Sequence, residues 1–448
     1  MSTSDVVILG GGSGGYACAF RAAQLGLSVT LIEQDKVGGT CLHRGCIPTK
    51  ALLHSAEVAD TARESASVGV RSTFDGIDMP AVHAYKDGVV AKLYKGLQGL
   101  VSAHKIDVVT GTGRYVGNRT VEVDGRRITG KSGVLATGSY AKVLPGIELG
   151  PRVLTSDQAL TLDNVPTRAI VLGGGVIGVE FASVWASFGA DVTIVEALPQ
   201  LIAAEDEWAS KQLTRAFRKR GITAKTSSPF TGVKETPDGV TVTLESGETL
   251  DADVLLVAVG RGANTQDLGA VSLDSGFVQV DSVLQTNEKD VYAVGDIVRG
   301  PQLAHRGFQQ GIFVAEQIAG LSPKQLPDSG IPRVTYSNPE VASVGLTEAQ
   351  AVEQYGNADA TVYDLAGNGK SQILGASGGV KLVRAGGSVV GIHMVGARVG
   401  ELIGEAQLVV NWGAYPEEVA HLVHAHPTQS EAFGEAHLAL AGKPLHSH

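Results

Sequence analysis

A glycine-rich segment occurs twice in the chain of 448 residues, and this duplication restricts the possible folds more than any other feature. Residues 5–33 read DVVILGGGSGGYACAFRAAQLGLSVTLIE, and residues 168–196 read RAIVLGGGVIGVEFASVWASFGADVTIVE. Each copy has an apolar run, a glycine turn, a segment with small residues, a second apolar run and a final glutamate. This order predicts two strand–helix–strand units of an α/β fold, both with the pattern that binds a dinucleotide.

The glycines of each unit have separate tasks. The first allows a tight turn, the second lets the backbone approach a pyrophosphate, and the third lets the helix pack closely on the strand. They are Gly10, Gly12 and Gly15 in the first unit and Gly173, Gly175 and Gly178 in the second. Glu33 and Glu196 would then bind the ribose. A single copy could be an ordinary glycine-rich turn, but two copies in register predict two dinucleotide sites.

Three shorter motifs support this layout. Residues 134–139 (VLATGS) and 255–261 (LLVAVGR) predict strands that end in glycine turns, and residues 291–296 (VYAVGD) predict a strand that ends in an aspartate. That aspartate could reach a bound group or only cap its strand. From about residue 331 no such motif follows, and strands mix with helices, so a separate domain is expected there.

Two cysteines lie directly after the first unit, in the segment GGTCLHRGCIPTK at residues 38–50. Gly45 eases the bend that would bring Cys41 and Cys46 together. A helix expected from Ile47 onwards would place Cys46 near its N-terminus, where the helix dipole favours a thiolate. A thiolate beside a second cysteine favours reversible disulfide chemistry.

The residues alone leave further roles open for the cysteine pair. The two thiols could be buried and inert, or they could bind zinc together with His43 or His54. An iron–sulfur cluster would need about four cysteines. The third cysteine, Cys18, lies in the apolar helix of the first unit and is expected in the core.

The composition limits the partners and the compartment. A formal net charge of −10 argues against a nucleic-acid-binding surface. The sequence contains no run of about 20 apolar residues, which is the length that a membrane-spanning helix needs. The chain has only 3 cysteines and does not start with a basic, apolar leader. Both features predict a cytoplasmic protein.

Together these motifs resemble those of the pyridine nucleotide–disulfide oxidoreductases. The resemblance rests on both glycine fingerprints, GGTCLHRGCIPTK, VYAVGD and the C-terminal HAHPTQSEAF, and it extends from Asp5 to about Ala439. It implies an α/β fold with two Rossmann-like domains and a C-terminal α+β dimerisation domain. The expected limits are 1–150 for the first part of an FAD domain, 151–265 for an NAD domain, 266–330 for the return of the FAD domain, and 331–448 for the dimerisation domain.

The resemblance assigns the two cofactors to residues of this chain. It implies FAD contacts at Gly10, Gly12, Gly15, Glu33, Lys50, Gly113, Thr137, Gly138, Asp296 and Ala304. It implies NAD contacts at Gly173, Gly175, Gly178, Glu196, Val233 and Gly260. NAD is favoured over NADP because Glu196 would repel a 2′-phosphate and residues 197–210 hold no Lys or Arg, but do hold Glu205, Asp206 and Glu207. No metal site is expected.

The resemblance also implies catalytic roles. Cys46 would be the thiolate facing the flavin, and Cys41 would attack the substrate disulfide. Lys50 would pair with Glu180 beside the flavin. His426 would act as acid and base with Glu431, in preference to the neighbouring His424, which is a rival on composition alone. In the family this histidine comes from the partner subunit, so a homodimer is implied.

Within this family, the motifs resemble those of the members that oxidise protein-bound dihydrolipoyl groups with NAD⁺. This implies a 2-oxo acid dehydrogenase complex, with a lipoyl domain of its acyltransferase subunit as the substrate carrier. The alternatives are an NAD(P)H-dependent reductase of another disulfide, of the glutathione or mycothiol type, and a flavin-loaded assembly subunit with little turnover. Three residues depart from the commonest family pattern, namely His43 and Arg44 between the cysteines and Gln429 near the end.

Overall fold

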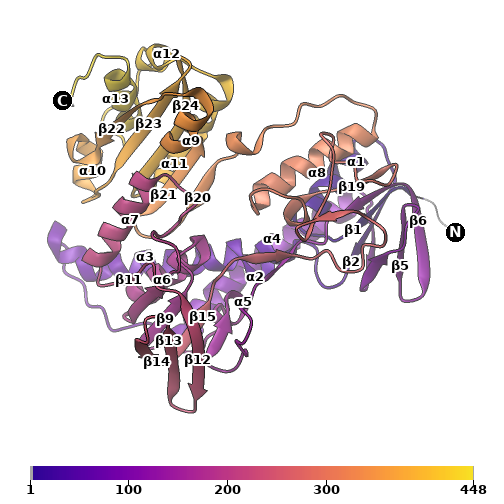
Figure 1. Ribbon diagram of the computed structural model, residues 1–448, viewed down its shortest axis with the longest axis horizontal. Coiled ribbons are helices and arrows are strands. Elements are labelled where there is room, and N and C mark those ends of the chain that lie inside the picture. Colours follow the sequence, from indigo (N-terminus) through magenta and orange to yellow (C-terminus); the bar gives the residue numbers. More distant parts are fainter. Residues whose placement is uncertain (1–3, 447–448) are drawn as a thin grey trace.

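The computed structural model describes residues 4–446, so the outermost residues of the expected ranges 1–150 and 331–448 lie outside the described part. Figure 1 shows three lobes around a central set of helices. The first lobe holds both the N-terminal strand and a late return segment, the second holds the middle of the chain, and the third holds the C-terminal part. The exact limits between these parts remain predictions.

The first lobe is built on a sheet whose strand order is β3-β2-β1-β6-β5-β4, with β19 paired to β6. Its parallel members are β1 (Ser4–Leu9), β2 (Val29–Glu33), β3 (Asp107–Thr110), β6 (Arg126–Leu135) and β19 (Val291–Ala293). The antiparallel strands β4 (Gly113–Tyr115) and β5 (Thr120–Val123) extend it. Helix α1 (Ser13–Gln24) follows the first glycine turn and packs against α8 (Ala304–Ile318).

The second lobe repeats this plan. Its parallel sheet has the order β11-β10-β9-β15-β8. The strands are β8 (Val153–Thr155), β9 (Arg168–Leu172), β10 (Asp191–Val195), β11 (Thr223–Lys225) and β15 (Val254–Val257). An antiparallel sheet of β12 (Phe230–Thr236), β13 (Gly239–Leu244) and β14 (Thr249–Ala252) stands where the first lobe has its β4–β6 meander. The duplication in the sequence is therefore a duplication of topology, and the predicted α/β class is confirmed.

Two connections between these lobes run side by side. Strand β7 (Ser139–Ala141) leaves the first lobe and β16 (Arg261–Ala263) returns to it, and the two pair antiparallel. Helices α5 (Ser156–Ala159), α6 (Val176–Phe188) and α7 (Glu207–Lys219) belong to the second lobe. A small pair of strands, β17 (Leu273–Asp274) and β18 (Phe277–Val278), follows the return.

A helical segment between β2 and β3 fills the centre of the molecule (Figure 1). It consists of α2 (Gly39–Arg44), α3 (Cys46–Glu64) and α4 (Met79–Ala103). Helix α3 packs against α6 of the second lobe and against α4. The cysteine segment therefore lies where the lobes meet.

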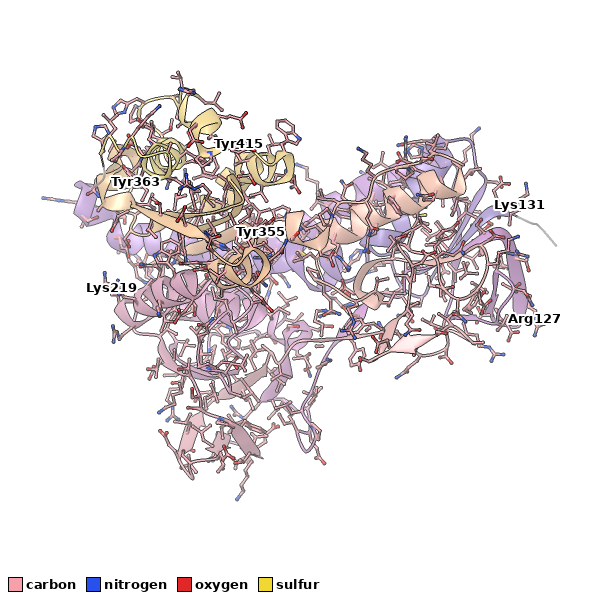
Figure 2. All side chains as sticks on the ribbon, turned by 45° about the horizontal axis from the view of Figure 1, so that its top comes forward. Arg127, Lys131, Lys219, Tyr355, Tyr363 and Tyr415 are labelled. Carbon is pink, nitrogen blue, oxygen red and sulfur yellow. The ribbon has the colours of Figure 1, made fainter. Side chains whose placement is uncertain are left out.

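The third lobe has an antiparallel sheet of order β20-β21-β24-β23-β22. Its strands are β20 (Arg333–Thr335), β21 (Glu340–Gly345), β22 (Asp359–Asp364), β23 (Gly379–Ala385) and β24 (Ser388–Gly396). The helices are α9 (Glu348–Tyr355), α10 (Gly369–Ile373), α11 (Val399–Trp412), α12 (Pro416–Ala420) and α13 (Glu431–Leu440). Figure 2 shows Tyr355, Tyr363 and Tyr415 in this lobe, while Arg127 and Lys131 mark the outer end of the first.

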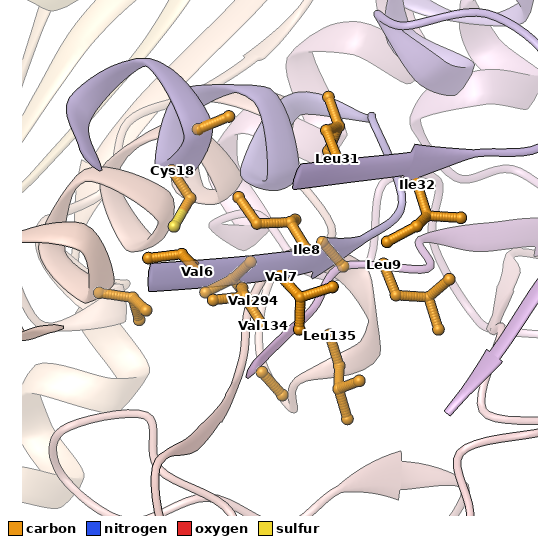
Figure 3. Close-up of a cluster of buried hydrophobic side chains, with 14 of the residues drawn as sticks. Val6, Val7, Ile8, Leu9, Cys18, Leu31, Ile32, Val134, Leu135 and Val294 are labelled. Carbon is orange, nitrogen blue, oxygen red and sulfur yellow. The ribbon is translucent and has the colours of Figure 1, made fainter. Parts of the chain in front are cut away.

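Each lobe has its own buried core. In the first, β1 contributes Val6, Val7, Ile8 and Leu9, and Figure 3 shows these side chains among Leu31, Ile32, Val134, Leu135 and Val294. Cys18 points from α1 into this cluster and is fully buried, as the sequence predicts. Among residues 4–446, no helix is long and apolar enough to cross a membrane.

Candidate active site

The two glycine turns have nearly the same geometry. Gly10 and Gly173 have φ of +103° and +110°, in the region that favours glycine. A β-carbon on Gly15 would lie 1.8 Å from the Gly10 carbonyl oxygen, and one on Gly178 would lie 1.9 Å from that of Gly173. Only glycine at these positions lets α1 and α6 start so close to their strands.

The second glycine of each turn leaves open space instead. A β-carbon on Gly175 would meet no atom within 4 Å, and one on Gly12 would meet only Gly39 Cα, at 3.9 Å. These glycines are the N-caps of α6 and α1, and no side chain caps either helix start. Each turn is thus a cradle of free N–H groups at a helix N-terminus, which suits a pyrophosphate.

The glutamates that close the two units also match each other. Glu33 accepts hydrogen bonds from Gly11 N (2.7 Å) and Asp35 N (2.9 Å). Glu196 accepts them from Gly174 N (2.6 Å) and Leu198 N (2.7 Å). Each carboxylate therefore holds its own glycine turn in shape, and its remaining lone pairs stay available for a ribose.

The other expected cofactor contacts lie at the edges of these turns. Thr137 Oγ1 donates to Asn264 O (2.5 Å) and Gly138 O accepts from Asn264 N (2.8 Å), so both residues brace the paired connections between the lobes. Asp296, after β19, accepts from Ser139 Oγ at 2.5 Å. Four expected contacts remain. Gly113 begins β4 and Ala304 begins α8, while Val233 lies on β12 and Gly260 in the turn after β15. Their contacts to cofactors remain predictions.

The two cysteines lie on consecutive helices. Cys41 is on α2, and Cys46 is the first residue of α3, one position before the predicted helix start. Both are free thiols, and their side chains are close enough to change each other's acidity. Gly45 makes the bend between the helices, and a β-carbon there would lie 3.0 Å from Thr40 O.

The two thiols differ in acidity. The hydrogen bond from Cys41 lowers the pKa of Cys46 to about 7 despite its burial, and the positive charge of Lys50 acts in the same direction. The same hydrogen bond and burial raise the pKa of Cys41 above its usual range. Cys46 is therefore the more acidic thiol of the pair, in agreement with its place at a helix N-terminus.

A partly buried ion pair lies near Cys46. Lys50 on α3 donates to both carboxylate oxygens of Glu180 on α6, at 2.9 and 2.8 Å. Burial would lower the pKa of Lys50, but Glu180 raises it above its ordinary value. The lysine is thus a fixed positive charge near Cys46.

Two tyrosines that no motif indicates also belong to this site. Tyr16 on α1 is close enough to both cysteines for their charges to add to burial and raise its pKa to about 12. The Tyr336 ring lies under Lys50, with Nζ 4.8 Å from the ring centroid. The sequence gives no signal for either residue, because Tyr16 lies in α1 and Tyr336 in the third lobe, both outside the cysteine segment.

The histidine pair lies in the third lobe. His426 Nδ1 is 2.8 Å from Glu431 Oε1, so the other ring nitrogen is free to exchange a proton. Burial would raise the pKa of Glu431, but the Thr428 N–H and His426 hold it below its ordinary value. The rival His424 is paired with Glu405 (2.9 Å) and is largely covered, whereas the His426 side chain is 78% exposed.

Within one chain the histidine pair is separate from the cysteines. Figure 1 shows α13, which begins at Glu431, at the outer side of the third lobe and α2 near the centre of the molecule. The structure thus joins Cys41 with Cys46, Lys50 with Glu180 and His426 with Glu431, but it does not bring the third pair to the first two in a single subunit. An exposed acid–base pair on another lobe fits a site completed by a second copy.

Two of the acidic residues that the sequence offers in favour of NAD over NADP have other partners. Glu205 and Asp206 are buried, and each is paired with a basic side chain of the third lobe. Glu205 binds Arg333 (2.9 Å) and Asp206 binds Lys381 (2.8 Å). Their charges are therefore neutralised by partners that lie far along the chain, and the preference for NAD rests on Glu196 together with the absence of Lys and Arg.

The residues that depart from the family pattern have structural contacts. The His43 ring lies 3.0 Å from Val37 O and meets the Tyr94 ring edge-on at 4.9 Å. Arg44 is 3.9 Å from Asp35 on the surface. Gln429 donates to Ala397 O at 2.7 Å and holds the loop that carries His426. His54 binds Glu57 rather than a cysteine.

Comparison with family models gives two matches that together span most of the chain. Residues 4–311 match the model described as pyridine nucleotide-disulphide oxidoreductase. Residues 331–437 match the dimerisation domain of the same family.

Curated proteins and solved structures agree with these matches. A dihydrolipoyl dehydrogenase of Bacillus subtilis is 41% identical and covers 99% of both chains. One from Thermus scotoductus is 37% identical and covers 100% of this chain and 99% of its own. The solved structure of LpdA from Mycobacterium tuberculosis has a TM-score of 0.89 at 27% identity, covering 97% of this chain and 99% of its own. The flavoprotein disulfide reductase RclA of Escherichia coli has a TM-score of 0.87 at 27% identity over 97% and 99%.

Proposed function

The chain belongs to the pyridine nucleotide–disulphide oxidoreductase family, and from this premise we propose that it is a dihydrolipoyl dehydrogenase. It oxidises protein-bound dihydrolipoyl groups with NAD⁺ through Cys41, Cys46 and FAD. The proposed substrate is supported by the 41% identity to a dihydrolipoyl dehydrogenase over 99% of both chains. The unequal acidity of the two cysteines supports the chemistry.

The reaction transfers two electrons and releases one proton. The substrate dithiol loses a proton to His426, and its thiolate attacks the Cys41 sulfur of the Cys41–Cys46 disulfide. Cys46 leaves as a thiolate, which its acidity and the Lys50 charge favour. The second substrate thiol then displaces Cys41, which takes up that thiol's proton. The substrate becomes a cyclic disulfide, and the enzyme is left with a Cys41 thiol, a Cys46 thiolate and a protonated His426.

When bound, FAD would supply the two-electron oxidation by which the Cys41–Cys46 disulfide re-forms with release of the Cys41 proton, and it would deliver those electrons to NAD⁺ as hydride. The residues of this chain bind and orient both cofactors. The open cradles at Gly12 and Gly175 fit two pyrophosphates, and Glu33 and Glu196 have acceptor capacity left for two riboses. Lys50 and Glu180 supply a fixed charge pair at the reacting thiolate.

A homodimer completes the site. The match to the family's dimerisation domain over residues 331–437 indicates self-association. Exposed His426, separated from the cysteines of its own chain, would then serve the cysteines of the partner. The substrate group would arrive on a lipoyl domain of an acyltransferase subunit within a 2-oxo acid dehydrogenase complex, in the cytoplasm.

The alternative substrate is a disulfide other than the lipoyl group. The similarity to a flavoprotein disulfide reductase of Escherichia coli favours this alternative, in which NADH or NADPH would reduce a disulfide of the glutathione or mycothiol type. A flavin-loaded assembly subunit is the remaining alternative, and it would keep its role after Cys46→Ser.

Steady-state turnover separates these functions. The purified holoenzyme is assayed with dihydrolipoamide and NAD⁺, and separately with lipoamide, glutathione disulfide and mycothiol disulfide using NADH or NADPH. We expect fast NAD⁺ reduction that Cys41→Ser abolishes. Slow turnover of dihydrolipoamide together with fast reduction of another disulfide would overturn the proposed substrate. If Cys41→Ser kept both activities, the proposed role of the cysteine pair would be overturned.

A further inference from the structure

Three distant parts of the chain meet at the Lys50–Glu180 ion pair. Lys50 comes from α3, Glu180 from α6, and Tyr336 from the connection between β20 and β21 in the third lobe. The Tyr336 N–H donates to Glu180 Oε1 at 2.9 Å, and its ring lies 4.8 Å from Lys50 Nζ. One residue therefore contacts both partners of the pair, the carboxylate through its backbone and the ammonium through its ring.

The surroundings screen these contacts only in part. The Glu180 side chain is 3% exposed and the Lys50 side chain is 31% exposed, so water screens the carboxylate little and the ammonium partly. An ammonium over an aromatic face is attracted by the negative face of the ring, more so where water is excluded. The ring also covers one side of the ammonium, which limits where the lysine can move.

The connection that carries Tyr336 is itself fixed. Asn338 N donates to Ser183 Oγ on α6 at 2.9 Å, and Ser337 Oγ donates to Pro339 O at 2.8 Å. A β-carbon on Gly400 of α11 would lie 3.6 Å from Tyr336 Cε1, so that helix lies beside the ring, although Tyr336 remains 36% exposed. The connection is therefore fixed through its backbone, and α11 borders the ring on one side.

The position of the Lys50 charge matters for Cys46. The groups that face this thiol are Cys41 on α2, Lys50 on α3, Glu180 on α6 and Tyr16 on α1. Lys50 favours the thiolate and Glu180 opposes it, so the net effect depends on how the ammonium lies between them.

We infer that Tyr336 is a positioning residue, whose ring holds the Lys50 ammonium where it stabilises the Cys46 thiolate. The third lobe thereby takes part in the redox site of its own chain. This inference rests on the proposed role of Cys46 as the thiolate and is independent of which disulfide is the substrate.

The test measures the acidity of Cys46 in the holoenzyme after anaerobic reduction. Alkylation by iodoacetamide is followed against pH, with peptide mapping to separate Cys46 from Cys41. Tyr336→Leu removes the aromatic face, and the midpoint of Cys46 should rise by about half a pH unit. Tyr336→Phe keeps the face, and the midpoint should stay at the parental value. Tyr336→Met serves in place of the leucine variant if that variant does not fold.

A double-mutant cycle identifies the route of the effect. In a Lys50→Met background, Tyr336→Leu should no longer move the midpoint, because the residue acts through the lysine. An unchanged or lower midpoint in folded Tyr336→Leu, or a shift that persists without Lys50, would overturn the inference. A parental Cys46 no more acidic than an ordinary thiol would instead overturn the proposed role of Cys46.

Discussion

Cys46 and Cys41 are chemically different although only four residues separate them. Cys46 begins a helix of 19 residues and has Lys50 one turn further along, whereas Cys41 lies in a short helix, and its pKa is raised. The helix dipole and the lysine both favour a negative charge on Cys46. This difference supports the proposed reaction, in which Cys46 leaves as the thiolate and Cys41 exchanges with substrate.

Removing the carboxylate that opposes this charge should make Cys46 more acidic. In Glu180→Gln the Lys50 charge remains but its counter-charge is lost, so the pKa of Cys46 should fall below about 7. The thiolate fraction at pH 6 would then rise, and alkylation of Cys46 should quicken by about threefold. Lys50→Met is the opposite control and should slow it. A slower rate in Glu180→Gln would contradict this role of the carboxylate.

At this scale the sequence predicts only residues that carry a motif. The cysteines, Lys50 and the HPTQSE pair could be named because the spacing around them resembles that of the family. Tyr16 and Tyr336 could not, because their role comes from packing between elements far apart in the chain.

The glycine turns show how one element serves both folding and binding. The third glycine of each turn lies against the carbonyl of the first, while the second borders open space. Within a single turn, the second glycine therefore has room for a side chain, whereas the third has none.

This difference predicts two different outcomes in the second lobe. Gly178→Ala places a β-carbon 1.9 Å from Gly173 O and should destabilise the protein by at least about 2 kcal/mol. Gly175→Ala should fold normally and raise the KM for NAD⁺ by about tenfold, because the methyl group takes the space of the pyrophosphate. Thermal unfolding and steady-state kinetics measure the two effects.

Gly232→Ala on β12 is the matched control, since a β-carbon there would meet no atom within 4 Å. It should change neither stability nor KM. A normal KM in folded Gly175→Ala would contradict the assignment of this turn to NAD.

At the scale of these elements the sequence predicted both units, because the fingerprint specifies a turn, a helix and two strands together.

The three lobes are joined by buried charges as well as by apolar packing. Lys381 on β23 reaches Asp206 at 2.8 Å and Glu348 at 2.7 Å, and both Lys381 and Asp206 are nearly covered. Burial opposes the charge of Asp206, but Lys381 and two backbone N–H groups hold its pKa below the usual value. The sequence could not reveal this, because Asp206 lies beside the NAD motif and its partner lies 175 positions later.

Lys381→Met should therefore destabilise the protein by about 3–5 kcal/mol at pH 7, because it leaves Asp206 buried without a counter-charge. The ion pair stabilises the fold above the unfolded pKa of Asp206, and this stabilisation is lost as the pH falls through its lower folded value. The difference between variant and parent should accordingly shrink below about pH 4. Lys211→Met removes an exposed pair with Glu207 and should cost less than about 0.5 kcal/mol. Equal losses in the two variants would contradict this.

A site shared between subunits predicts complementation. Cys46→Ser and His426→Ala should each be inactive, yet a mixed dimer has one site with both intact residues. Equimolar mixing after dissociation and reassociation should restore about a quarter of the parental activity. Recovery would be absent if each chain used its own histidine.

The most direct test follows the electrons through one turnover. The oxidised holoenzyme is mixed anaerobically with one equivalent of dihydrolipoamide per chain, new protein thiols are counted, and NAD⁺ is then added. We predict that thiols appear on Cys41 and Cys46, and that NAD⁺ reoxidises them with formation of one NADH per chain. No new protein thiols, or the same yield of NADH from Cys41→Ser, would contradict a path from dithiol to nicotinamide through this cysteine pair.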